Sequence, residues 1–182
     1  MINLLRKLYL QKMNLTDYIK DIPDFPKAGI VFKDISPLLA NAAATDKAIE
    51  LLAMGLHNFQ ATKVVGIESR GFLLGILLAQ HLKLGFVPVR KPGKLPGEII
   101  SQNYHLEYGE DALEIQANSI QPGDLVIIHD DVLATGGTAE AACKLVEKCG
   151  GVVVQCNFLM ELDFLEGRTK IEKYQLHSLI HY

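Results

Sequence analysis

Short apolar runs alternate with amphipathic stretches along most of the chain. The runs are of strand length and rich in Val and Ile, which is typical of strands buried on both faces of a parallel sheet. We expect strands at Lys63 to Ile67, Phe86 to Val89, Leu125 to Ile128 and Val152 to Leu159, and an alternating edge strand at Gln175 to Tyr182. Helical spacing predicts helices from Thr45 to near Asn58, from Phe72 to Leu82 with Gly85 closing it, and through Ala142 to Cys149, ended by Gly150 and Gly151. This alternation predicts an α/β fold with a central, mostly parallel sheet flanked by helices.

Three segments depart from this alternation. Asn14 to Ile22 predicts a short helix that Asn14 or Thr16 can cap. Ile22 to Leu39 contains three prolines and a glycine, so its backbone is expected to be extended or turned. Ser101 to Gln116 forms two strand-like arms around Gly109 and predicts a hairpin polar enough to stay mobile.

Composition narrows the class of protein. With 182 residues, 49% apolar content and a net charge of −3, residues 1–182 are expected to form a single domain. Three cysteines without a CxxC pair suggest neither a disulfide framework nor a zinc site, and we expect buried thiols in a reducing cytoplasm. The first dozen residues carry charges and lack a cleavage site, and no apolar run reaches the roughly 18 residues of a membrane helix. Residues 1–13 are expected to be disordered or to lie upstream of the true start, with Met13 as an alternative start.

The most informative stretch is Leu125 to Ala142, because it joins a buried strand, two acids and a glycine-rich turn before a helix. Asp130 and Asp131 are expected where the strand leaves the sheet, at the edge where open α/β folds bind ligands. Glycine lets backbone N–H groups approach an anion, the Thr hydroxyls donate to it, and the helix N-terminus adds partial positive charge. A Gly-Gly-Thr turn can also be purely structural, but adjacent carboxylates at a strand end favour a ligand with hydroxyls or a metal.

Two further polar segments follow strand ends. Arg70 lies on the turn after Lys63 to Ile67, where it could cap carbonyl groups or hold an anion. Arg90, Lys91 and Lys94 follow Phe86 to Val89 on a loop stiffened by prolines. These cations could form a solvated patch, yet clusters of Arg and Lys also suit a pyrophosphate group.

The order of these motifs resembles the adenine phosphoribosyltransferases, a branch of the type I phosphoribosyltransferase family. The resemblance covers nearly all of Ile22 to His181. It rests on the segments PDFPKAGIVFKDIS (23–36), ESRGF (68–72), RKPGKLPG (90–97), YHLEYG (104–109), DDVLATGGT (130–138) and ELDFLEGR (161–168). Two positions depart from the family pattern: His129 interrupts an apolar approach to the acids and is expected to affect sheet packing, and Lys33 stands where many members have Arg, whose planar fork Lys lacks.

The resemblance implies the type I fold, with a small base-recognition hood at residues 14–40 and a flexible catalytic hairpin. It implies that Ala134, Thr135, Gly136, Gly137 and Thr138 hold the 5-phosphate of 5-phosphoribosyl 1-pyrophosphate (PRPP), and that Asp130 and Asp131 bind the ribose hydroxyls. Pyrophosphate is assigned by the same resemblance to Glu68, Ser69, Arg70, Arg90, Lys91 and Lys94. A cis peptide bond between Glu68 and Ser69 is also expected.

Adenine is assigned, again by resemblance, to Val31, Phe32, Lys33 and Leu162. The backbone of Val31 would read the amino group and N1, because one acceptor and one donor complement a 6-amino purine and mismatch a 6-oxo purine. Glu107 would be the general acid/base facing N7, although it could also be one more exposed acid among 21 acidic residues.

The implied activity is a magnesium-dependent glycosyl transfer, in which adenine and PRPP give AMP and pyrophosphate for purine salvage. Mg²⁺ would be held mainly by oxygens of PRPP and pyrophosphate, with no direct protein ligand. The basic loop would reach the neighbouring subunit's site, which implies a homodimer in the cytoplasm without nucleic-acid or membrane partners. Two alternatives are a phosphoribosyltransferase for a 6-oxopurine such as xanthine or hypoxanthine, and a non-catalytic PRPP-sensing regulator. The net charge of −3 disfavours a DNA-binding regulator.

Overall fold

The computed structural model describes residues 13–182 with the exception of 57–59 and 106–109. The chain divides into two compact units, Met1–Leu51 and Leu52–Tyr182. That the two units fold together as one domain stays a prediction of the sequence. Among the described residues, no helix combines the length and the apolar character that a membrane crossing requires.

The first unit contains a small antiparallel ribbon. It is built from η1 (Leu15–Tyr18), β1 (Lys20–Pro23), β2 (Val31–Asp34), α2 (Ser36–Leu39) and the start of α3 (Ala42–Met54). Strand β1 pairs with β2 in the register Lys20↔Asp34 to Pro23↔Val31. The helix expected over Asn14 to Ile22 is therefore wrong in its second half. Asn14 does cap the first turn, accepting from Thr16 N at 3.2 Å, but Pro23 favours extended backbone before it and the chain turns into β1.

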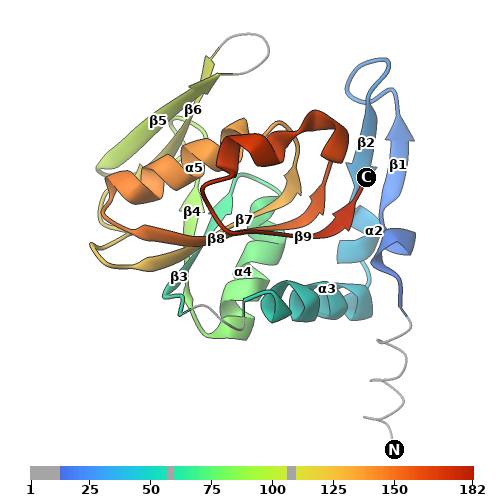
Figure 1. The fold of residues 1–182 in the computed structure, drawn as a ribbon, viewed down its shortest axis with the longest axis horizontal. Coiled ribbons are helices and arrows are strands. Elements are labelled where there is room, and N and C mark those ends of the chain that lie inside the picture. Colours follow the sequence, from blue (N-terminus) through green and yellow to red (C-terminus); the bar gives the residue numbers. More distant parts are fainter. Residues whose placement is uncertain (1–12, 57–59, 106–109) are drawn as a thin grey trace, which may run out of the picture. The chain divides into compact units, whose positions relative to one another are not determined.

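The second unit is organised around a five-stranded sheet in the order β4-β3-β7-β8-β9, as Figure 1 shows. The strands are β3 (Lys63–Ile67), β4 (Gly85–Val89), β7 (Leu125–Leu133), β8 (Val152–Glu161) and β9 (Leu176–His181). All four neighbouring pairs are parallel, and β9 lies at an edge, so the predicted parallel sheet and its edge strand are confirmed.

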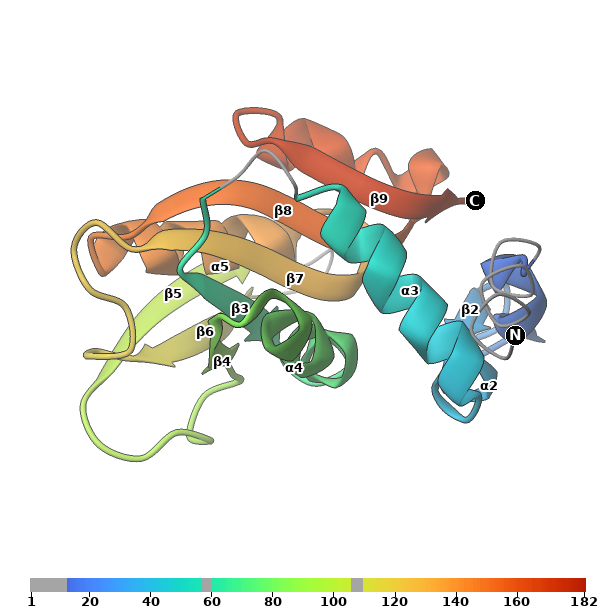
Figure 2. The same ribbon diagram turned by 90° about the horizontal axis from the view of Figure 1, so that it is seen from below.

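Helices cover both faces of this sheet. Helix α4 (Gly71–Leu82) packs on β3 and β7, and α5 (Gly137–Lys148) packs on β7 and β8 across the sheet (Figure 2). Successive side chains of β7 point to opposite faces of the sheet, and Val126 and Ile128 join the core beneath α5. His129 points to the other face, where its Cδ2 lies 3.3 Å from the position a Cβ on Gly75 of α4 would take. The sheet is thus buried on both sides, as its apolar strands predict.

His129, the residue that interrupts the apolar approach to the acids, is fully buried and belongs to a network of polar side chains. Its Nδ1 lies 3.1 Å from Asn157 Oδ1, and Asn157 Nδ2 donates to Leu52 O at 3.3 Å. Gln155 belongs to the same network and donates from Nε2 to Gly55 O at 2.9 Å. Burial lowers the pKa of His129 to about 4, so it is neutral at physiological pH. The polar groups therefore support the end of α3 from the sheet.

The hairpin predicted between Ser101 and Gln116 is confirmed. Strand β5 (Ile99–His105) pairs antiparallel with β6 (Glu110–Gln116), from Ile99↔Gln116 to His105↔Glu110. Leu113 and Ile115 of β6 lie in the same core as α5, and the hairpin projects beside that helix (Figure 1). Its base is therefore fixed by apolar packing.

Several predicted boundaries differ from the structure. Helix α3 runs from Ala42 to Met54 and not from Thr45 to near Asn58. Strand β7 does not end before the acids but runs to Leu133, because β8 continues to pair with it. Helix α4 is closed not by Gly85 but by Lys83, which adopts a left-handed conformation at φ 59°. The three cysteines are free thiols, with Cys143 and Cys156 buried and Cys149 half-buried.

Candidate active site

Asp130 and Asp131 lie on β7 just beyond the point where β3 stops pairing with it. The β3 register ends at Gly66↔His129, whereas β8 accompanies β7 to Leu133↔Glu161. Successive side chains leave a strand on opposite faces. Asp131 is accordingly 2% exposed, while Asp130 is half-buried. The acids thus lie at the carboxyl edge of the sheet, where α/β folds bind their ligands.

The two carboxyl groups lie close enough to affect each other's ionisation, and both are near Arg70. Asp131 Oδ2 lies 2.9 Å from Arg70 Nη2, and Asp131 N donates to Asp130 Oδ1 at 2.9 Å. Burial and the charge of Asp131 raise the pKa of Asp130 well above its usual range. Burial also raises the pKa of Asp131, and Arg70 offsets only part of this effect. Two full negative charges are therefore costly here unless a ligand donates hydrogen bonds to them, as a diol would.

Helix α4 begins directly against these acids. A Cβ on Gly71 would lie 2.7 Å from Asp130 Oδ1 and 2.9 Å from His129 O, so glycine is required for this close approach. The preceding turn contains a cis peptide bond between Glu68 and Ser69, which confirms the expectation. Arg70 is the N-cap residue of α4. The helix N-terminus, with its partial positive charge, and Arg70 thus face the carboxylate pair from one side.

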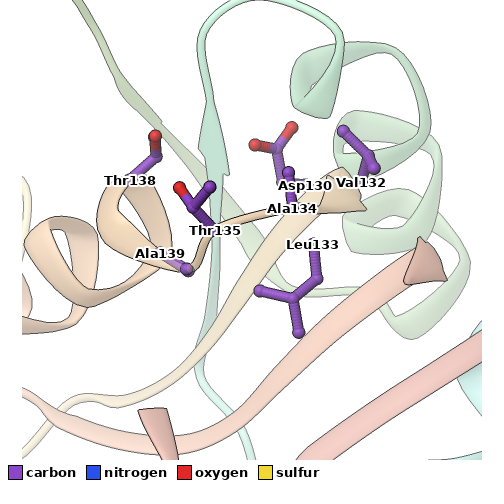
Figure 3. A pocket seen from close by; sticks show the side chains of 8 residues that line it. Asp130, Val132, Leu133, Ala134, Thr135, Thr138 and Ala139 are labelled. Carbon is purple, nitrogen blue, oxygen red and sulfur yellow. The ribbon is translucent and has the colours of Figure 1, made fainter. Parts of the chain in front are cut away.

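The glycine-rich turn between β7 and α5 forms a small cavity of about 140 Å³. Figure 3 shows that the carboxylate of Asp130 and the hydroxyls of Thr135 and Thr138 point to the same side of this turn. The cavity is lined by Asp130, Val132, Leu133, Ala134, Thr135, Gly136, Thr138 and Ala139. Since α5 starts at Gly137, its free N–H groups and dipole are directed at the cavity, which makes it suited to a phosphate group.

The shape of the turn depends on a second segment that sequence reasoning did not single out. Gly136 has φ 79°, and a Cβ placed on it would lie 3.0 Å from the carbonyl carbon of Gly167. A Cβ on Gly167 would in turn collide with Ala134 O and lie 2.8 Å from Gly136 N. Both glycines are therefore required by the close packing of η3 (Gly167–Ile171) against the turn. The small residue before Arg168 in ELDFLEGR was the only sign of this in the sequence.

The basic loop after β4 is tied back to the turn before α4. Glu68 accepts from Arg90 Nη2 at 2.8 Å, from Arg90 Nε at 3.3 Å and from Lys91 N at 2.8 Å. The hydrogen bonds from Arg90 are the main cause of a lowered pKa for Glu68, which is therefore ionised at neutral pH. Arg90 Nη1 also donates to Lys94 O at 3.2 Å. The structure thus places the predicted pyrophosphate residues Glu68, Arg90 and Lys91 in one cluster, in which Glu68 binds the guanidinium group of Arg90 and the backbone N–H of Lys91.

Other predicted residues are described only in part. Glu107 lies outside the described residues, so its role stays a prediction. Leu162 follows β8 directly and is half-buried. In the first unit, Val31 is 49% exposed, the Phe32 ring lies 5.2 Å from that of Phe25, and Lys33 Nζ lies 2.7 Å from Asp21 Oδ1. Contacts between these residues and a base stay a prediction.

Comparison with known proteins decides which family uses this arrangement. Residues 34–179 match the family model described as phosphoribosyl transferase domain. The chain is 58% identical to the adenine phosphoribosyltransferase of Flavobacterium johnsoniae over 170 residues, which cover 93% of this chain and 100% of that protein. The chain belongs to the adenine phosphoribosyltransferase family. The resemblance and the type I fold expected from the sequence are thereby confirmed.

Solved structures of adenine phosphoribosyltransferases agree with this membership. The crystal structure from Thermoanaerobacter pseudethanolicus is 50% identical and superimposes with a TM-score of 0.91, covering 95% of this chain and 99% of that one. The enzyme from Saccharomyces cerevisiae, complexed with adenine and an imino-sugar bisphosphate, is 44% identical with a TM-score of 0.88, covering 94% and 98% of the two chains. The same fold therefore extends over nearly the whole chain.

Proposed function

We propose that this phosphoribosyltransferase joins adenine to PRPP and releases AMP and pyrophosphate. The observation that carries the proposal is the carboxylate pair Asp130 and Asp131 beside the Ala134–Thr138 cavity, with Arg70 bound to Asp131 from the facing turn. Such a site offers acceptors for a ribose diol, donors for a terminal phosphate and a cation for a second phosphate group. PRPP carries all three groups.

Each part of PRPP has a partner in this proposal. The 5-phosphate binds the N–H groups and hydroxyls of the Ala134–Thr138 turn, and the ribose hydroxyls donate to Asp130 and Asp131. The departing pyrophosphate is held by Arg70, Arg90, Lys91 and Lys94, together with N–H groups that follow Glu68 in the Glu68–Ser69 turn, since the Glu68 N–H itself donates to Val89 O at 2.9 Å. Pyrophosphate would draw Arg70 away from Asp131, while the ribose hydroxyls replace Arg70 as the compensation for that carboxylate.

The base is proposed to bind through the backbone of Val31, with Phe32 and Lys33 beside it; Leu162 stays a base contact implied by the resemblance. Glycosyl transfer from PRPP passes through a state with positive charge on the ribose, which the bound pyrophosphate and the two carboxylates stabilise. Glu107 is proposed to exchange a proton with N7 of the purine, because a carboxyl group enclosed beside a substrate has a raised pKa and can carry a proton near neutral pH.

Mg²⁺ fits the chemistry of this site without a dedicated protein cage. The ion prefers oxygen ligands, keeps several of its waters and usually binds substrate phosphates with one or two carboxylates at most. Asp130, which lines the phosphate cavity, would suit its hydrated shell, while PRPP and pyrophosphate oxygens would hold it directly. When bound, Mg²⁺ neutralises charge on the pyrophosphate as that group departs.

The reaction is tested by measuring products in the presence and absence of magnesium. We expect one AMP and one pyrophosphate for each adenine consumed, with activity abolished by EDTA and restored by added Mg²⁺. Release of ribose 5-phosphate without AMP would instead identify a hydrolase. Activity that persists in EDTA would contradict the role of magnesium.

We also propose a cytoplasmic homodimer. Helix α4 supports it, because Leu73 and Ile76 on its outer face are 45% and 54% exposed and are large apolar residues on one helical stripe. The resemblance adds that the basic loop reaches the site of the neighbouring subunit. Both features are consistent with a second copy covering α4.

Ile76→Glu is expected to convert the dimer into a monomer, because a charge cannot be buried in an apolar interface without a partner. The molar mass is measured by analytical ultracentrifugation at several protein concentrations. Val152→Glu is the matched control, since Val152 is 52% exposed at the first residue of β8, outside α4, and it should leave the mass unchanged. A dimer that survives Ile76→Glu would place the interface elsewhere.

A further inference from the structure

Lys91 has side-chain partners that the proposed pyrophosphate role does not explain. Its ammonium group forms an ion pair with Asp111 Oδ2 and a short hydrogen bond to the Tyr104 hydroxyl. It also lies over the Tyr104 ring, 5.1 Å from the centroid. Both partners belong to the hairpin β5–β6, while Lys91 belongs to the basic loop. The cation is therefore held by a second element, outside its own loop.

The hairpin register brings the two partners together. Tyr104 and Asp111 are direct cross-strand neighbours. Asp111 Oδ2 accepts from the Tyr104 hydroxyl at 3.1 Å, and Asp111 Oδ1 accepts from Ala112 N at 2.8 Å. Each oxygen of the Asp111 carboxylate thus has a donor besides Lys91, so the carboxylate has one defined orientation. The Lys91 ammonium lies where this oriented carboxylate and the phenol converge.

The backbone around Lys91 is fixed as well. Arg90 and Glu114 exchange backbone hydrogen bonds at 2.9 and 2.7 Å, which join the loop to β6. Glu114 Oε2 accepts from Gly93 N at 3.0 Å, and Glu68 accepts from Lys91 N at 2.8 Å. Both the main chain and the ammonium group of Lys91 are consequently held in place before any ligand binds.

Lys91 and Asp111 are both charged at neutral pH. Burial alone would lower the pKa of Lys91, but the hydrogen bonds to Asp111 and Tyr104 outweigh burial and raise that pKa. The hydrogen bond from Lys91 lowers the pKa of Asp111. The side chain of Lys91 is 37% exposed, and an ammonium group has three donors, of which these partners use two. One donor can therefore be directed to an incoming anion.

We infer that Asp111 is a positioning residue that, together with the Tyr104 hydroxyl, holds the Lys91 ammonium group in place for pyrophosphate. This inference rests on the proposed role of Lys91 in pyrophosphate binding. A free lysine side chain loses much rotamer freedom on binding an anion, and a lysine already fixed by a carboxylate does not. Asp111 acts through Lys91 and does not touch the substrate itself.

The test is a double-mutant cycle on the full-length enzyme, with kcat and KM measured for PRPP and, in the reverse direction, for pyrophosphate. Asp111→Asn keeps the shape of the side chain but removes its charge. We expect KM for PRPP and for pyrophosphate to rise by about five- to tenfold, with kcat within roughly twofold of the parent. In a Lys91→Ala background, Asp111→Asn should have no further effect on either KM.

Glu147→Gln is the matched control. Glu147 accepts from Lys173 Nζ at 3.2 Å and from the Tyr174 hydroxyl at 2.8 Å, so it forms a second carboxylate, lysine and tyrosine cluster at the end of α5. It should leave both KM values unchanged. Unchanged or lowered KM values in Asp111→Asn, or an equal rise in the Lys91→Ala background, would overturn the inference. If Lys91→Ala itself leaves the pyrophosphate KM unchanged, the proposed role of Lys91 fails instead.

Discussion

Asp130→Asn is expected to lower kcat/KM for PRPP by roughly 100-fold and, at the same time, to raise the thermal stability of the unliganded protein. The loss follows because a hydrogen bond to a charged partner contributes about 1.5–3 kcal/mol, and the ribose hydroxyls would lose the charged acceptor. The amide oxygen can still accept from Asp131 N, which now donates to Asp130 Oδ1. Local structure should therefore persist, so activity and stability can be separated.

The gain in stability follows from the pKa of Asp130, which burial and the charge of Asp131 raise. A raised pKa in the folded state means that ionisation of Asp130 costs folding free energy. This cost is absent below the pKa of an unfolded Asp and fully present above the raised pKa. The Asn variant should thus be more stable at neutral pH, by roughly 1 kcal/mol or about 2–4 °C in Tm, and the gain should disappear in acid.

Asp124→Asn is the control with the opposite sign. The hydrogen bond from Lys63 lowers the pKa of Asp124, and Lys63 Nζ lies 2.6 Å from Asp124 Oδ2 at the other edge of the sheet. A lowered pKa contributes stability above the unfolded pKa that is lost as pH falls through the folded pKa. This variant should lose stability at neutral pH and keep its activity. Full activity in Asp130→Asn would remove Asp130 from the proposed site.

Gly136→Ala is expected to lower both stability and the affinity for PRPP. A non-glycine residue at φ 79° costs about 1–2 kcal/mol, and the new Cβ would also meet the carbonyl group of Gly167. The turn between β7 and α5 must then shift away from η3, which moves the N–H groups that would bind the 5-phosphate. KM for PRPP should rise by roughly tenfold or more, since displaced donors lose charge-assisted hydrogen bonds.

Gly123→Ala separates backbone strain from displacement of the turn. Gly123 has φ 88°, and a Cβ there would meet nothing within 4 Å. Both variants should lose stability in denaturant titrations, but only Gly136→Ala should change KM for PRPP. Equal KM values in the two variants would show that the Gly136 turn does not bind the substrate.

Strands β3 and β7 of the sheet could be predicted from sequence because each one contains a continuous run of apolar residues. Val64, Val65, Ile127 and Ile128 are fully buried in strands that the sequence already marked as apolar runs. The glycine-rich turn before α5 was also predictable, since Gly136 stands directly before an amphipathic helix and Gly137 begins it. The cis peptide bond at Glu68–Ser69 was expected only from the resemblance.

What could not be predicted depends on residues far apart in the chain. The length of β7 is set by its pairing with β8 as far as Glu161. A prediction based on the apolar run alone therefore ends the strand too early. The contact between Arg70 and Asp131 joins the ends of two strands, and their motifs were assigned to different parts of the substrate. In the sequence, Asp111 is one acid among several in the hairpin. Only the structure shows that it lies opposite Tyr104 and forms an ion pair with Lys91.

The central claim is that this site transfers the phosphoribosyl group to adenine. It is tested most directly by supplying PRPP and Mg²⁺ with adenine, hypoxanthine, guanine or xanthine, and by measuring the nucleotide formed by the parent protein and by Glu107→Gln. We predict AMP from adenine, no nucleotide from the three 6-oxopurines, and a much slower reaction in the variant. Nucleotide formation from a 6-oxopurine would contradict the assignment of the base. PRPP binding without any product would mean that the chain has kept the fold and the binding site of its family without the activity.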